Sequence, residues 1–179
     1  MMNTSLKYIT IAMIAAGGLI FLSCGAAINE PGRTYYSDYH FSIVFPPGWQ
    51  VEQEPSELMV EAWEDYVNDD DMFEENMNIT YEKLTKKTTL EAYYSEVNRN
   101  SRMDLANFVV EKEGEITIDG QPARAIRSTF TMAEGALRMI GYVTIKDDHA
   151  LTISCLMEPA KYSHYHEIFK AAVHSIKFE

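Results

Sequence analysis

The chain has 179 residues, with 27 acidic and 15 basic side chains, and its net charge at pH 7 is −12. This charge argues against nucleic acid as a partner, because binding to phosphates depends on clustered Lys and Arg. It also argues against the body of the protein lying on an anionic membrane. Aromatic residues make up 12% of the chain, which indicates a folded domain, and the length suits one domain with its own core.

The segment 9–24 is apolar; it follows the basic residue Lys7 and ends before the next charged residue, Glu30. A basic start, an apolar run of this length and a small residue at its end are typical of a secretory signal peptide. The run ends in a sequence that resembles a bacterial lipobox, Phe21-Leu22-Ser23-Cys24. We therefore predict a lipoprotein signal peptide over residues 1–23.

A lipobox predicts that Cys24 becomes the first residue of the mature chain and carries lipid, including palmitate-type acyl chains, that anchors it to the membrane. Residues 24–34 are small and polar and are expected to form a tether. Gly25 replaces the aspartate that retains many Gram-negative lipoproteins in the inner membrane. The expected location is the cell envelope, at the outer membrane (periplasmic side or surface) in a Gram-negative host. The alternatives are an uncleaved spanning anchor over 8–29 and ordinary signal-peptidase cleavage near Ala27.

The first half of the following domain is predicted to be rich in strands. Apolar side chains alternate over 41–45 and again over 49–51, which predicts two strands separated by a tight corner at 46–48. Segment 58–67 fits a third strand or a short amphipathic helix, and 77–81 alternates again as a fourth strand. The aromatic side chains around the corner are expected to be core residues: Phe41, Phe45 and Trp49.

The second half is predicted to contain a helix, four strands and a closing helix. A capping-box pattern in which Thr88 caps the helix and Glu91 reaches back, followed by apolar residues with helical spacing, predicts a helix over about 89–106. The strands, joined by short links, are 108–118, 124–132, 137–145 and 149–157. Pro159 suits the first turn of the closing helix. Residues 35–179 are thus predicted to be one α+β domain with helices packed against a mainly antiparallel sheet.

The segment 65–75 is the main polar cluster and is predicted to be a long exposed loop. Its carboxylates are oxygen ligands of the type that calcium binds, but the EF-hand spacing fails, so no metal site is assigned. Binding of a metal or small ligand by this loop is kept as the alternative function. Aromatic residues among the acids point instead to a protein partner. The residues expected to contact an envelope protein partner are Trp63, Tyr66, Asp69, Asp70, Asp71 and Phe73.

No pattern of catalytic residues or cofactor ligands accompanies these features. His164 and His166 are two residues apart on a predicted helix and therefore point in different directions. The motifs of serine hydrolases, P-loop proteins and dinucleotide-binding proteins do not occur. Cys155 lies on the apolar side of a predicted strand and is expected to be a buried free thiol. An enzyme is therefore the least favoured class, and no cofactor is predicted.

The order of the elements resembles the PsbP/DcrB-like group of small exported domains. The features that match are the pattern Tyr39-x-Phe41-Ser42-Ile43-x-Phe45-Pro46-x-Gly48-Trp49, the helix after the fourth strand, the hairpin Asp119-Gly120-Gln121-Pro122-Ala123 and the closing helix that ends in His174-Ser175-Ile176. They span about residues 36–179. The resemblance implies a sandwich of helices around a central antiparallel sheet. It also implies a non-catalytic binding or assembly module, without implying photosynthesis.

Overall fold

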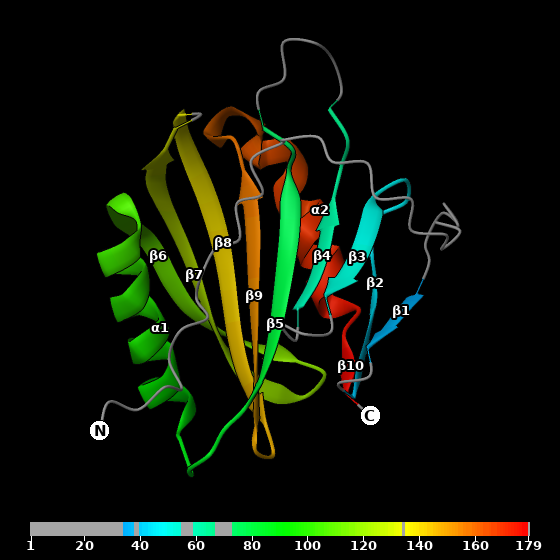
Figure 1. Ribbon diagram of the computed structural model, residues 1–179, viewed down its shortest axis with the longest axis vertical. Coiled ribbons are helices and arrows are strands. Elements are labelled where there is room, and N and C mark those ends of the chain that lie inside the picture. Colours follow the sequence, from blue (N-terminus) through cyan, green and yellow to red (C-terminus); the bar gives the residue numbers. More distant parts are fainter. Residues whose placement is uncertain (1–33, 38–39, 55–58, 67–72, 134, 179) are drawn as a thin grey trace.

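Seven antiparallel strands form the main sheet, in the spatial order β3-β4-β5-β9-β8-β7-β6 (Figure 1). The bounds of these strands are β3 Gln50–Glu54, β4 Met59–Trp63, β5 Asn76–Lys83, β6 Ala106–Ile118, β7 Gln121–Met132, β8 Gly135–Lys146 and β9 His149–Met157. The hairpin turn between β6 and β7 has the expected Asp-Gly form, because Asp119 and Gly120 both have positive φ, at 46° and 77°.

The computed structural model describes residues 34–37, 40–54, 59–66, 73–133 and 135–178. The predicted signal peptide, the tether up to residue 33, Cys24 and Asp69 to Asp71 lie outside these ranges. Within them, no helix has the length and apolar character needed to cross a bilayer.

A second, smaller sheet consists of β1 Thr34–Ser37, β2 Phe41–Val44 and β10 Lys177–Phe178, with β2 in the middle. The sequence did not predict this sheet. The two strands expected on either side of the corner at 46–48 are present, but β2 belongs to the small sheet and β3 to the large one. Gly48 has a φ of 87°, a conformation that glycine adopts without steric cost, and it lies at this corner. The ambiguous segment 58–67 forms strand β4 over Met59–Trp63, not a helix.

The helices cover opposite faces of the main sheet (Figure 1). The closing segment is a 3-10 turn, η1 Pro159–Lys161, followed by α2 Tyr162–His174. Phe169 and Tyr165 of α2 join the main core, where the ring of Phe169 meets that of Trp49 edge-on at 5.6 Å. Trp49 is only 7% exposed, which confirms its predicted place in the core. Cys155 is also fully buried in this core as a free thiol, as predicted.

The other helix, α1 Leu90–Asp104, packs against β6, β7 and β8 on the opposite face, through Tyr94 against Ile126 and Val143. Its predicted capping box is wrong in register. The cap is Thr89, whose hydroxyl accepts a hydrogen bond from the amide of Ala92. Glu91 does not reach back to the cap, because its carboxylate forms an ion pair with Arg124 at 3.5 Å.

Candidate binding surface beside the β4–β5 connection

The face of the sheet that carries α1 has no described helix over β3, β4 and β5, since α1 packs on β6, β7 and β8 (Figure 1). Val60 and Ala62 of β4 point into the main core, so the residues that alternate with them point to this open side. The register places Glu52 opposite Glu61, and Glu61 opposite Asn78. We call the side chains on this open side the acidic sheet face. They are Glu52, Glu61, Trp63, Asn76, Asn78 and Ser154.

Two carboxylates of the acidic sheet face oppose each other directly. Like charges at opposed positions of neighbouring strands are destabilising. Within the described chain, neither Glu52 nor Glu61 forms an ion pair with a Lys, Arg or His side chain. Burial raises the pKa of Glu61, and the negative charges of Glu52 and Glu74 raise it further. The site therefore opposes two negative charges, of which Glu61 is half-buried and Glu52 exposed, and the described chain places no cation in an ion pair with either.

Two amides flank the carboxylates and are held in fixed positions. Asn78 donates from Nδ2 to Oδ1 of Asn76 at 2.9 Å, and Asn76 donates from Nδ2 to the backbone oxygen of Glu74 at 2.9 Å. Trp63 lies opposite Asn76 on the next strand and is half-buried. The surface therefore combines negative charge, oriented amides and one large aromatic ring, a combination suited to binding a polar or cationic group of another molecule.

The connection between β4 and β5 is closed at its base by a hydrogen bond from the amide of Glu64 to the backbone oxygen of Glu75, at 3.0 Å. Both side chains turn towards α2. Glu64 accepts a hydrogen bond from the hydroxyl of Tyr165, and Glu75 pairs with Nζ of Lys161 at 2.9 Å. Glu75 is only 2% exposed. The prediction that Glu75 belongs to an exposed loop is therefore wrong. Glu75 can be buried because Lys161 compensates its charge in the interior.

The other predicted partner-binding residues fall in three environments. Trp63 lies on the acidic sheet face, and Tyr66, the next aromatic residue along the chain, is 52% exposed. Phe73 is half-buried and packs against a cluster that includes Leu137 and Leu156, on the same side of the sheet as α1. Asp69, Asp70 and Asp71 lie outside the described residues. In the part of the chain that the structure describes, no three His, Cys, Asp or Glu side chains are placed to hold a metal ion.

The sequence predicted Trp63 as part of a surface but missed Glu52, Glu61, Asn76 and Asn78. A signal for them was present, since polar residues alternate with Val60, Ala62, Met77 and Ile79 on two predicted strands. Alternation indicates that one face is not buried in the core. It does not indicate whether a helix covers that face, which depends on where α1 packs.

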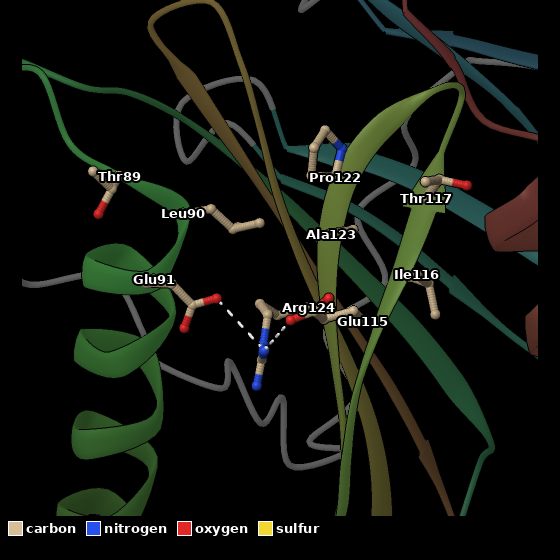
Figure 2. Close-up of a pocket in the computed structure, with 9 residues that line it drawn as sticks. All are labelled: Thr89, Leu90, Glu91, Glu115, Ile116, Thr117, Pro122, Ala123 and Arg124. Atoms are coloured by element: carbon tan, nitrogen blue, oxygen red, sulfur yellow. Dashed lines mark hydrogen bonds and ion pairs between the residues drawn. The ribbon is translucent and has the colours of Figure 1, made fainter.

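An open pocket of about 870 Å³ lies between the start of α1 and the β6–β7 hairpin, beside Leu90, Pro122 and Arg124 (Figure 2). Arg124 forms ion pairs with Glu91 at 3.5 Å and Glu115 at 3.2 Å, and its guanidinium lies 5.0 Å from the ring centre of Tyr94. The two carboxylates already neutralise this cation. Glu91 and Glu115 are themselves 65% and 82% exposed, so the mouth of the pocket carries a small excess of negative charge.

Comparison with solved structures identifies proteins that share this fold. The solution structure of a cyanobacterial PsbP from Synechocystis matches with a TM-score of 0.63 and 12% identity, over 88% of this chain and 98% of that one. LpqN of Mycobacterium tuberculosis, described as involved in cell envelope biogenesis, matches with a TM-score of 0.62 and 10% identity, over 84% and 86%. The Ran-binding protein Mog1p of Saccharomyces cerevisiae matches with a TM-score of 0.57 and 12% identity, over 82% and 95%.

At these identities the likeness concerns the fold alone, and it confirms the predicted PsbP-like α+β architecture. No curated protein sequence matches the chain. The family model of DcrB matches residues 61–175, from β4 to the end of α2. Since this match covers well over half of the chain, the protein belongs to the DcrB family.

Proposed function

We propose that the protein is a membrane-anchored, non-catalytic binding module of the cell envelope that holds a basic partner protein on its acidic sheet face. The observation that carries the proposal is the opposed pair Glu52 and Glu61, which has no cation beside it in the described chain. A Lys or Arg of a partner would relieve the repulsion between the two carboxylates. Binding would then replace an unfavourable interaction by a favourable one.

The aromatic residues next to the charges provide contact area. Trp63 is half-buried on the acidic sheet face, and Tyr66 is exposed where the connection 65–75 begins. Tyr and Trp are the residues that most often dominate interface energies. The carboxylates of Asp69, Asp70 and Asp71 in the same connection would speed and orient the approach of a basic surface.

Anchoring through lipid on Cys24 places this module in the envelope. The lipobox-like end of the segment 9–24 supports the anchor, and the involvement of LpqN in cell envelope biogenesis supports the compartment. The name of Mog1p as a Ran-binding protein supports use of this fold for binding other proteins.

Site-specific photo-crosslinking in intact cells tests the proposal. A photoreactive amino acid that replaces Asn78 should crosslink to a protein partner. The same amino acid in place of Ser95, on the exposed side of α1, should not. The double variant Glu52→Gln/Glu61→Gln should reduce crosslinking from position 78 several-fold. Glu96→Gln/Glu167→Gln makes the same charge change on the helices and should leave it unchanged. Equal crosslinking from both positions, or no effect of the first double variant, would contradict a binding role for this face.

Calcium titration of the protein distinguishes the second candidate function, a metal site in the connection 65–75. Saturable binding at micromolar calcium that is lost on replacing Asp69, Asp70 and Asp71 by Asn would favour the metal site. Crosslinking that depends on Glu52 and Glu61, without a response to calcium, would favour the partner site.

A further inference from the structure

Two arginines lie together on the face of the sheet that carries α2, away from the acidic sheet face. Arg127 of β7 is opposite Ile140, and Arg138 of β8 is opposite Thr129, so the two arginines are diagonal neighbours on adjacent strands. Their side chains are 33% and 22% exposed. In a protein with a net charge of −12, two partly exposed arginine side chains next to each other form a local region of opposite sign.

One carboxylate bridges the two arginines. Glu111 places Oε2 at 2.8 Å from Nε of Arg127 and Oε1 at 2.9 Å from an Nη atom of Arg138. The register of β6 against β7 shifts between Val110 and Lys112, and this irregularity directs Glu111 to the arginine side. Lys112 is itself opposite Arg127 and exposed, so it adds a third positive charge to the same face.

An aromatic ring at the start of α2 completes the cluster. The guanidinium carbons of Arg127 and Arg138 lie 5.1 Å and 4.9 Å from the ring centre of Tyr162, and Arg127 donates to the Tyr162 hydroxyl at 2.8 Å. The ring therefore holds both arginines in fixed positions. The first turn of α2 contains no acidic residue and has no side-chain cap, so the helix adds partial positive charge here.

The cluster has more donors and more positive charge than its own acceptors satisfy. A guanidinium has five N–H donors, so the two arginines present about ten. The acceptors that the described chain offers them are the Glu111 carboxylate and the Tyr162 hydroxyl. Three positive side chains therefore share one face with a single carboxylate, and Nε of Arg138 is buried without a hydrogen-bond partner in the described chain. Paired guanidinium groups with free donors match the geometry of an oxyanion.

From this arrangement we infer a second binding site, in which Arg127, Arg138 and Lys112 bind an oxyanion of the phosphate or carboxylate type. Tyr162 holds the arginines in the binding orientation, and the Glu111 carboxylate competes with the anion for their donors. The site is independent of the proposed partner surface, because it lies on the opposite face of the sheet and selects the opposite charge. The anion could belong to a free metabolite or to a lipid headgroup, which share this chemistry.

NMR titration at constant ionic strength tests the inference on the intact folded chain. Inorganic phosphate and acetate are added separately, and the side-chain N–H signals of Arg127 and Arg138 are followed. Saturable shifts with Kd on the order of 1 mM are expected for at least one anion. Vesicles of phosphatidylglycerol form a third sample; loss of the same signals there would identify a headgroup as the source. Absence of saturable shifts with all three probes would overturn the inference.

Two variants and one control separate binding from a structural role. Arg138→Gln should weaken anion binding about tenfold, because it removes charge-assisted hydrogen bonds. Glu111→Gln should strengthen binding by a similar factor, because it removes the competing carboxylate. Arg124→Gln is the matched control: Arg124 lies on β7, as Arg127 does, but its side chain faces α1 and lies over the ring of Tyr94, so the variant should leave anion binding unchanged. If Glu111→Gln weakened binding, the cluster would be structural only and the inference would be wrong.

Discussion

The carboxylate of Glu75 is almost completely buried and lies 2.9 Å from Nζ of Lys161, a residue 86 positions later in the chain. Glu75 ends the β4–β5 connection, and Lys161 immediately precedes α2, so this pair joins the connection to the helix on the other side of the sheet. The backbone amide of Glu158 also donates to Glu75, at 3.3 Å. A buried carboxylate of this kind depends on its partners, because water cannot solvate it.

We expect Lys161→Met to destabilise the protein by about 3 kcal/mol, because it leaves the Glu75 charge buried without its cation. Urea denaturation followed by circular dichroism measures the change. The double variant Glu75→Gln/Lys161→Met should recover most of the loss, since it also removes the buried charge that Lys161 compensates. Lys170→Met is the control, as Lys170 is about half exposed and pairs only at the surface with Glu167. A double variant no more stable than Lys161→Met would contradict the explanation.

A second prediction concerns the pH dependence caused by Glu61. Burial, Glu52 and Glu74 raise its pKa in the folded state above the ordinary 4.5, so the folded protein disfavours the charged form. The folded state then binds more protons than the unfolded state between these two pKa values, and stability falls as pH rises through that window. The resulting cost persists at neutral pH and is absent below the unfolded-state pKa.

Glu61→Gln should therefore increase the free energy of unfolding at pH 7. The difference from the unmodified protein should shrink as pH falls through the raised pKa of Glu61 and should be nearly absent below about 4.5. Thermal denaturation across this pH range measures the effect. Glu115→Gln serves as the control, because its side chain is 82% exposed and substitutions at such sites change stability by about 0.5 kcal/mol or less. A Glu61→Gln protein less stable than the original at pH 7 would show that the carboxylate has a cationic partner.

Trp49→Ala should cost about 3–5 kcal/mol, since the substitution opens a large cavity beside Phe169 and Tyr165. The shift of the urea midpoint measures this cost. Val51→Ala, at a partly buried position two residues later in β3, provides a milder comparison. An unchanged midpoint for Trp49→Ala would mean that the indole does not pack in the core.

Periodicity predicted most of this fold because each segment contains its own signal. Alternating apolar residues identified the strands β5 to β9, and helical spacing identified α1 and the closing helix. The small sheet could not be predicted, because β10 has only two residues and pairs with β2 across the length of the chain. Such pairing depends on where α2 ends and has no local pattern.

The candidate sites were predicted less well, for a related reason. Glu75 was assigned to an exposed loop because its sequence neighbours are acidic, whereas its burial depends on Lys161, far away in the sequence. The arginine cluster likewise combines Glu111, Arg127, Arg138 and Tyr162 from three strands and a helix. No short motif contains these four residues, so only the register of the sheet brings them together.

Cys24→Ala tests the membrane anchor. If Cys24 carries lipid, the variant should lose labelling by a fatty-acid analogue and should accumulate as the uncleaved precursor, because both reactions require the thiol. Labelling of cells followed by immunoprecipitation provides the measurement. Cys155→Ala is the matched control: its thiol is fully buried, so labelling should be unchanged. Labelling that persists in Cys24→Ala would disprove lipid attachment at this residue.

The final prediction concerns the acids in the β4–β5 connection. In the proposed complex, Asp69, Asp70 and Asp71 attract a basic partner over a distance, whereas Trp63 and Tyr66 supply the contact. Long-range attraction mainly changes the association rate and is screened by salt over roughly 8 Å at physiological ionic strength. Reversal of the three charges to Lys should therefore slow association and flatten its dependence on salt.

Tyr66→Ala should act differently, because it removes contact area without changing charge. It should increase the dissociation rate and leave the salt dependence intact. Surface plasmon resonance with the crosslinked partner, at several salt concentrations, separates the two effects. Since Tyr66 is 52% exposed, its removal should leave the melting temperature nearly unchanged, which excludes unfolding as the cause. If the charge reversal left both the association rate and its salt dependence unaltered, the connection would not steer the partner, and recognition would rest on the acidic sheet face alone.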